Sequence, residues 1–245
     1  MRMNRSDLRG FIARRFSRGE YLGLYLTVGL LCSLCLLVVF ALVVHSLPRS
    51  RHLIPFDETL GLRLQEYRQA SPGVRALCIA ITELGSVRAL AGLTLFVALL
   101  LIVRGRRLIA LVWLIAPAAS GLLDLGLKGL FERERPPFRD QFIDETTKSF
   151  PSGHSMGALI TYGLLAYILV RVLPRAGLRI LALCGLTMLI LAIGFSRIFL
   201  GAHYFSDVLG GYAVGGVWLA ACITALETIR RRPKNLQDCP NPNDQ

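Results

Sequence analysis

Charged residues are scarce in this chain of 245 residues, since Asp, Glu, Lys and Arg together make up only 18% of it. A soluble domain typically contains about 25% charged residues. Apolar residues account for 53% of the sequence, and the mean hydropathy is +0.53. The composition therefore excludes an ordinary soluble domain and favours a membrane protein.

Long apolar runs fill most of the chain. A helix needs roughly 20 apolar residues to cross a hydrocarbon core of about 30 Å. Windows of about this length cover residues 21–47, 85–103, 108–131, 156–173, 178–199 and 207–229, and the second helix could start as early as Val74. Lipid offers no partner to backbone polar groups, and the runs are too long and too uniformly apolar for barrel strands. We predict an all-α fold, one bundle of six transmembrane helices.

The sequence has little evidence of a cleaved signal peptide or of functional cysteines. No A-x-A-like site follows the first apolar run, which exceeds the roughly 7–15 residues of a signal peptide, so we expect it to remain as an anchor. Cys32 and Cys35 form a C-x-x-C motif inside this apolar run, without a second pair among the six cysteines. We therefore expect neither a zinc site nor a redox pair.

Acidic residues are fewer than basic ones, 16 against 28, which gives a net charge of +12. With the N-terminus in the cytoplasm, most of the surplus falls on the inner segments 1–20, 104–107, 171–179 and 227–245. This is the positive-inside pattern, and it predicts that both termini are cytoplasmic. The basic clusters then serve topology and attraction to membrane lipids, so we expect no nucleic-acid partner.

The segments outside the apolar windows suggest three parts of the chain. We expect a basic cytoplasmic N-terminal segment at 1–20, a transmembrane domain at 21–229 and a polar, disordered cytoplasmic tail at 230–245. An outer loop covers residues 46–75 and contains "FDETLGLRLQEY", which predicts an interfacial helix with Asp57 as N-cap. An ordinary surface helix remains the alternative for this segment.

Polar residues that are costly at membrane depth gather at one side of the predicted bundle. They all lie at outer helix ends or in outer loops: Lys128, Arg135, Ser152, His154, Arg197, His203 and Asp207. Ionisable groups in such places are usually functional. Each cation alone would suit a snorkelling lysine or an interfacial anchor. Three cations together repel one another unless an anion joins them, and guanidinium groups match phosphate oxygens.

The stretch "SFPSGHSMG", residues 149–157, places a helix start among these cations. A helix N-terminus has free backbone N–H groups that bind phosphate. Pro151 suits a first-turn position, and Gly153 would let an oxyanion approach the backbone closely. Ser149 is interpreted as a cap. The motif G-x-S-x-G is absent, so Ser152 is not expected to be a nucleophile.

The two histidines provide candidate chemistry. His203 and Asp207 are four residues apart at the start of the sixth helix, so the carboxylate can orient the ring and leave a nucleophilic lone pair. His154 is then the candidate acid and base. Asp124 is interpreted as a structural partner. Three surrounding cations would repel a divalent ion, so no metal site is expected.

Three segments resemble the ordered motifs of the type 2 phosphatidate phosphatase superfamily, K-x6-R-P, P-S-G-H and S-R-x5-H-x3-D. They are "KGLFERERP", "PSGH" and "SRIFLGAHYFSD". The resemblance implies a metal-independent phosphatase without cofactor. It implies His203 as nucleophile, Asp207 as its partner and His154 as acid. It implies phosphate binding by Lys128, Arg135, Ser152, Gly153 and Arg197. Glu134 stands where a proline is frequent in the family.

An outward-facing anion site at head-group level predicts a lipid phosphate as substrate, hydrolysed through a phosphohistidine. Phosphatidate, phosphatidylglycerol phosphate and undecaprenyl diphosphate all remain candidates. The alternatives are a lipid phosphotransferase using the same site, or a non-enzymatic transporter. The short cytoplasmic loops indicate a multi-pass protein of a bacterial inner membrane, with the site facing the periplasm or exterior. The sequence predicts no oligomeric state.

Overall fold

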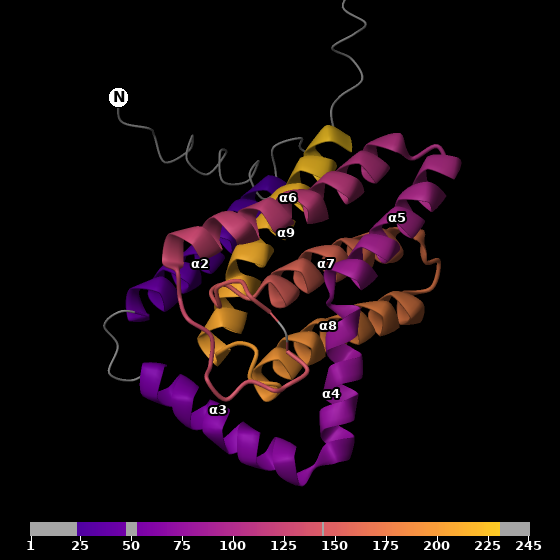
Figure 1. Ribbon diagram of the computed structural model, residues 1–245. Helices are drawn as coiled ribbons and strands as arrows, with labels where there is room; N and C mark the ends of the chain where they lie inside the picture. Colours follow the sequence, from indigo (N-terminus) through magenta and orange to yellow (C-terminus); the bar gives the residue numbers. More distant parts are fainter. Residues whose placement is uncertain (1–23, 48–52, 144, 231–245) are drawn as a thin grey trace, which may run out of the picture.

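The computed structural model describes residues 24–47, 53–143 and 145–230. Within these ranges all regular structure is helical (Figure 1). The helices are α2 (Leu24–Ser46), α3 (Leu53–Ala70), α4 (Pro72–Leu84), α5 (Val87–Val103), α6 (Arg107–Phe131), α7 (Gly153–Val172), α8 (Ala176–Phe199) and α9 (Phe205–Arg230). The predicted all-α fold is confirmed, whereas the predictions for residues 1–20 and, beyond residue 230, for the tail at 230–245 concern residues outside the described ranges.

Five helices, α2, α6, α7, α8 and α9, are long and apolar enough to cross a membrane. Helices α4 and α5 meet the same criterion only as a pair, bent by 45° at the break between them, and this pair is the sixth candidate span. The bend follows from the sequence, because Ser86 caps α5 in an extended conformation and its Oγ accepts from the Ala89 N–H at 3.2 Å. Within the described residues, five of the six predicted spans are thus matched by single helices, and the remaining one is matched by this bent pair.

Helix α7 packs closely against α9 through small residues. A Cβ at Gly211 would lie 2.6 Å from the Ser152 carbonyl oxygen, and one at Gly215 would lie 3.2 Å from the Met156 carbonyl oxygen. These glycines are four residues apart on one face of α9, the spacing that lets membrane helices approach backbone to backbone. The close contact fixes the start of α7 against the start of α9.

Helix α3 lies across one end of the bundle, beside the α6–α7 loop (Figure 1). It is the helix expected in the outer loop, but it begins at Leu53, so the prediction of Asp57 as N-cap is wrong. Asp57 is 2% exposed, and its carboxylate accepts from the Ser206 N–H at 3.1 Å. Arg68 donates to the carbonyl oxygens of Phe199 (2.6 Å) and Phe138 (2.7 Å). Helix α3 therefore braces the loops at this end.

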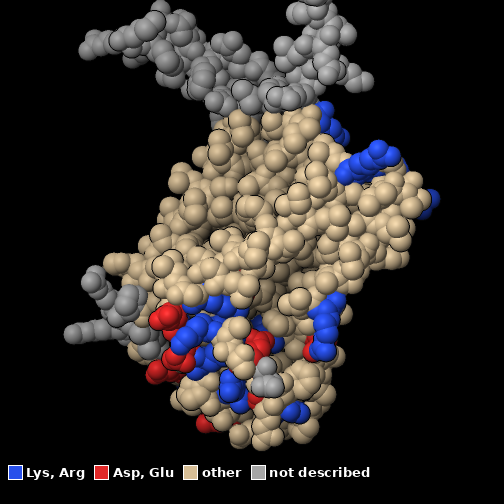
Figure 2. Space-filling view, turned by 45° about the horizontal axis from the view of Figure 1, so that its top comes forward, with Lys and Arg blue, Asp and Glu red and all other residues tan. Residues whose placement is uncertain are grey.

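Charged side chains are separated from a broad belt that lacks them on the face in Figure 2. Acidic and basic residues gather at the end that holds α3 and the α6–α7 loop, and a smaller basic group marks the opposite end. A belt without charged residues between two charged ends is the arrangement expected of a membrane-spanning bundle. The mixed charged end is where the predicted site residues lie.

Candidate active site

Four stretches of the chain meet at the charged end of the bundle: the end of α6, the loop at 132–152 with the first turn of α7, the last turn of α8, and the α8–α9 turn with the first turn of α9. Helix α6 ends because Glu132 takes a left-handed conformation, φ +46°, and donates its N–H to the Lys128 carbonyl at 3.0 Å. Gly201 (φ +64°) turns the chain after α8, where a Cβ would lie 2.9 Å from the Phe138 carbonyl oxygen. The two turns place the loop at 132–152 against the α8–α9 turn.

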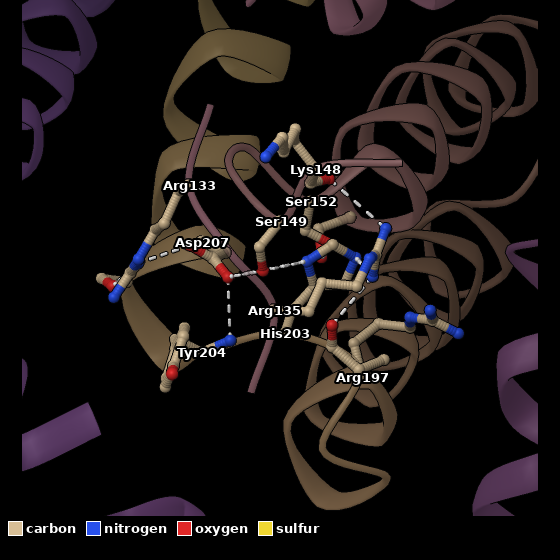
Figure 3. A network of polar contacts seen from close by, with 12 residues as sticks. Arg133, Arg135, Lys148, Ser149, Ser152, Arg197, His203, Tyr204 and Asp207 are labelled. Carbon is tan, nitrogen blue, oxygen red and sulfur yellow. Dashed lines mark hydrogen bonds and ion pairs between the residues drawn. The ribbon is translucent and has the colours of Figure 1, made fainter. Parts of the chain in front are cut away.

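His203 and Asp207 face each other, with 3.6 Å between His203 Nδ1 and Asp207 Oδ2. His203 was predicted at the start of a helix, but it lies in the turn before α9, which begins at Phe205. Ser149 bridges the pair, because its hydroxyl donates to Asp207 Oδ2 at 2.5 Å and lies 3.4 Å from His203 Nδ1 (Figure 3). The interpretation of Ser149 as a helix cap is therefore wrong.

The surroundings of the His203 ring determine its tautomer. Arg135 Nη1 lies 3.3 Å from His203 Nε2, and a guanidinium has only donors, so Nε2 is the acceptor. The ring proton is then on Nδ1, pointing to Ser149 and Asp207. Burial lowers the pKa of His203 to about 4, although the bond to Asp207 opposes the shift. The ring is neutral at pH 7, with the Nε2 lone pair on the side of the cations.

Asp207 is completely buried and is held by more groups than the sequence predicted. Arg133 Nη1 donates to Asp207 Oδ1 at 2.5 Å, and the Tyr204 N–H donates to Oδ2 at 2.9 Å. Arg133 also pairs with Asp57 of α3 at 3.0 Å and lies 4.3 Å above the Tyr204 ring. Hydrogen bonds to charged groups contribute about 1.5–3 kcal/mol each. Arg133 therefore orients the carboxylate that orients His203.

The predicted cations do not all share one partner. Arg135 and Arg197 converge on the carboxylate of Glu145, Arg135 at 2.6 Å from Oε2 and Arg197 through Nη2 to Oε1. Lys128 instead donates to Asp124 Oδ2 at 2.8 Å. Asp124 Oδ2 would lie 2.8 Å from a Cβ at Gly153, so the Lys128–Asp124 pair rests against the start of α7. Gly153 thus accommodates Asp124, which the sequence did not predict.

The start of α7 is close to the predicted geometry. Ser152 is the N-cap residue, and the first helical hydrogen bond runs from the Met156 N–H to the Ser152 carbonyl at 3.0 Å. The N–H groups of Gly153, His154 and Ser155 therefore precede the first i to i−4 bond of α7. Pro151 comes before the cap, so the prediction that it occupies the first turn is wrong. The Ser152 N–H donates to the Asp207 carbonyl at 3.0 Å, which ties α7 to α9.

Glu145 is at the centre of the arrangement, although the sequence analysis did not single it out. Its Oε1 lies 3.9 Å from His154 Nδ1, and its Oε2 lies 3.9 Å from His203 Nε2. Burial raises the pKa of Glu145, but the charges of Arg197, of the His203 ring when it is protonated and of Arg135 outweigh that effect and lower it to about 2. A carboxylate therefore stands between two imidazoles and two guanidiniums, where a tetrahedral oxyanion would fit.

A polar cavity of about 350 Å³ opens beside this carboxylate and is lined by Glu134, Arg135, Arg139, Glu145, Thr146, Thr147 and Lys148. Arg135 is anchored independently of Glu145, since it donates to the carbonyl oxygens of Thr147 (2.7 Å) and Ala202 (2.9 Å). Arg197 is 2% exposed, and its Nη1 donates to Thr82 of α4 at 2.9 Å. Its Nε has no partner within the part of the chain that the structure describes.

The sequence of this chain is similar to those of known membrane phosphatases. A family model described as the PAP2 superfamily matches residues 108–231, more than half of the chain. Phosphatidylglycerophosphatase B of Bacillus subtilis is 30% identical over 182 residues, which cover 73% of this chain and 87% of that protein. Lipid A 1-phosphatase of Rhizobium etli is 36% identical over 120 residues, which cover 45% of this chain and 47% of that protein.

The fold also has a solved counterpart. The crystal structure of a transmembrane PAP2 type phosphatidylglycerolphosphate phosphatase from Bacillus subtilis matches with a TM-score of 0.76 and 28% identity, covering 82% of this chain and 99% of that chain. The residues that carry the resemblance, from Lys128 to Asp207, all lie within the matched family region. The family match, the sequence identity and the shared helical architecture together show that this chain belongs to the PAP2 superfamily of phosphatases.

Proposed function

We propose that this protein hydrolyses the phosphomonoester of a membrane lipid through a phosphohistidine formed on His203. The observation that carries the proposal is the two-sided placement of the His203 ring. Its Nδ1 side faces Ser149 and Asp207, while its Nε2 side lies 3.3 Å from Arg135 and 3.9 Å from Glu145. A neutral imidazole held this way offers its lone pair to an atom bound between the cations.

In the first half-reaction, the Nε2 lone pair attacks phosphorus and the bond from phosphorus to the ester oxygen breaks. The leaving oxygen takes a proton from the His154 imidazolium and departs as an alcohol. The positive charge formed on the His203 ring is shared through Nδ1–H with Asp207, whose own charge is held by Arg133. This support of a cationic ring by a buried carboxylate is the role of the acid in a catalytic triad.

In the second half-reaction, a water molecule attacks the phosphorus and the P–N bond breaks. Neutral His154 accepts the proton of the water, so inorganic phosphate leaves and His203 returns to its neutral form. Arg135 and Arg197 stabilise charge on the non-bridging oxygens in both steps, together with the free N–H groups at the start of α7. Lys128 would join them when its bond to Asp124 is exchanged for a phosphate oxygen.

A lipid substrate is supported by the position of the residues and by the relatives. The residues lie at the charged end of the bundle, next to the belt that lacks charge (Figure 2). Relatives are named for phosphatidylglycerophosphate and lipid A phosphate, and the first of these is matched over most of its length. We therefore place phosphatidylglycerol phosphate first, ahead of phosphatidate and undecaprenyl diphosphate. The site is proposed to face the periplasm or exterior of a bacterial inner membrane.

Purified protein is expected to release inorganic phosphate from phosphatidylglycerol phosphate with excess EDTA present. The expectation rests on the positive charge of Arg135, Arg197 and Lys128, which would repel a divalent ion. A malachite-green assay should compare phosphatidylglycerol phosphate, phosphatidate and undecaprenyl diphosphate in one detergent. Activity that disappears with EDTA and returns on adding a divalent metal would contradict the mechanism.

A phosphotransferase would use the same histidines and differ only in the acceptor. The product distinguishes the two, because hydrolysis yields free phosphate and transfer yields a second phosphorylated lipid. Membership of a phosphatase family sets aside the alternative of a non-enzymatic transporter. The lipid product should therefore be followed in the same assay by thin-layer chromatography.

Replacing His154 with alanine is expected to slow phosphoenzyme formation by about 10²–10⁴-fold on a lipid substrate, the usual contribution of a general acid. The loss on p-nitrophenyl phosphate should be at least tenfold smaller, because nitrophenolate leaves without a proton. Rapid-quench measurement of the first turnover separates this step from the hydrolysis of the intermediate. Equal losses on the two substrates would show that His154 is not the acid.

A further inference from the structure

Building on the proposed function, we infer that Glu145 is a specificity-determining residue. It holds one negative charge in the anion site, so that phosphomonoester dianions displace it and phosphodiester monoanions do not. The bulk lipids around a membrane enzyme are mostly phosphodiesters, and this site lies at the charged end of the bundle, next to the belt that lacks charge. An enzyme that acts on a rare lipid phosphate needs such a means of excluding them.

The contacts of Glu145 are those that the proposed mechanism assigns to the substrate phosphate. Its Oε1 bonds Arg197 and lies 3.9 Å from His154, while its Oε2 lies 2.6 Å from Arg135 and 3.9 Å from His203. Each carboxylate oxygen thus faces one guanidinium and one imidazole. Both histidines proposed to take part in the reaction, and two of the three cations proposed to bind phosphate, lie around this single side chain.

The carboxylate can leave without disturbing the groups that it contacts. Glu145 is in a loop, and its side chain is 26% exposed toward the polar cavity. Arg135 is still held by Thr147 and Ala202, and Arg197 by Thr82. The Nε of buried Arg197 has no hydrogen-bond partner among the described residues, so it is a further donor that the two carboxylate oxygens leave unused. A phosphate group has more oxygens than a carboxylate, and this spare donor suits a ligand of that kind.

Charge decides which ligand takes the place of Glu145. A phosphomonoester carries about −1.5 to −2 near pH 7, since its second pKa is about 6. A phosphodiester carries −1, the same charge as the carboxylate that it would displace, and it has only two free oxygens. A monoanion therefore gains little electrostatic attraction by the exchange, whereas a dianion interacts roughly twice as strongly with Arg135 and Arg197.

The test measures binding and needs no turnover. Purified protein in detergent at pH 8 is titrated calorimetrically with inorganic phosphate, a dianion, and with dimethyl phosphate, a monoanionic diester. Wild-type protein should bind phosphate and prefer it strongly over the diester. In Glu145→Gln, phosphate should bind at least about tenfold more tightly, and the preference for phosphate over dimethyl phosphate should fall at least about tenfold. The matched control is Glu66→Gln, an exposed acid on α3 at the same end of the molecule.

An unchanged preference in Glu145→Gln, or weaker phosphate binding, would overturn the inference. Glu145→Ala provides a second variant with the same expected direction, and thermal unfolding checks that each protein is folded. Phosphatidylglycerol should also inhibit hydrolysis at least about tenfold more strongly in Glu145→Gln than in wild type. If wild-type protein binds phosphate but releases none from lipids, the proposed function is wrong. The role of Glu145 in selecting the anion would still stand in that case.

Discussion

His203→Ala is expected to lower phosphate release from the lipid substrate by at least about 10⁴-fold, because it removes the atom that forms the covalent bond to phosphorus. Losing a covalent nucleophile costs about 10⁶-fold in a well-studied hydrolase. Asp207, Ser149 and Arg133 remain in the variant, but they have no ring to orient. After acid or alkaline quench of a ³²P-labelled substrate, wild-type protein should show an alkali-stable, acid-labile phosphoenzyme and the variant none.

The exposed His45, at the end of α2, provides the matched control for this experiment. His45→Ala should retain wild-type activity and the labelled intermediate. Calorimetric binding of inorganic phosphate to His203→Ala separates a chemical defect from a collapsed site, since Arg135 and Arg197 are anchored by other residues. Labelling of His203→Ala at the wild-type level would place the nucleophile elsewhere.

Arg197→Gln is expected to reduce kcat by about 10³–10⁵-fold, the range for an arginine that stabilises a transferring phosphoryl group. Arg197 is 2% exposed, so its charge acts without screening by water. Arg197→Lys should fall between wild type and Arg197→Gln, because an ammonium group keeps the charge but loses the planar pair of donors. Single-turnover kinetics on phosphatidylglycerol phosphate measure the effect.

The control for this arginine is Arg88→Gln, because the Arg88 side chain is 88% exposed and pairs only with Glu83 among the ion pairs of the described residues. Its activity should match wild type. Removing a buried cation also affects folding, so the melting temperature of each variant must be compared before kcat is interpreted. An Arg197→Gln protein that is folded and retains activity within tenfold of wild type would argue against charge stabilisation by this residue.

The spans could be predicted because their physical cause is local. Each needs about 20 apolar residues, and the lipid leaves helix as the form of the backbone, so length and composition suffice. The break between α4 and α5 was not predicted, and the second helix was only expected to start somewhere between Val74 and Gly85, because the capping of α5 by Ser86 lies inside an apolar stretch. The start of α3 at Leu53 was missed for a related reason, because Asp57 has the residue type of a cap but is used in a tertiary ion pair.

The functional residues likewise fall into those that local spacing predicts and those that depend on tertiary packing. His203 and Asp207 are four residues apart, and the predicted helix start was enough to bring them together, although the ring lies in the turn before α9. Arg133 and Arg135 stand two positions apart in "ERERPP", and no local rule assigns one to Asp207 and the other to His203. The direction of each side chain depends on how the loop at 132–152 packs against α3 and the α8–α9 turn.

The sequence alone predicts a helical bundle of six spans, with histidines, cations and a helix N-terminus at one end. These features can be predicted because the length of an apolar run and the short-range spacing of residues are properties of single segments. Only the tertiary structure decided that Lys128 pairs with Asp124, that Ser149 and Arg133 hold Asp207, and that Glu145 fills the site. Those contacts join residues from different segments, often in loops without periodicity. Their partners are selected by packing and charge in three dimensions, which no single segment encodes.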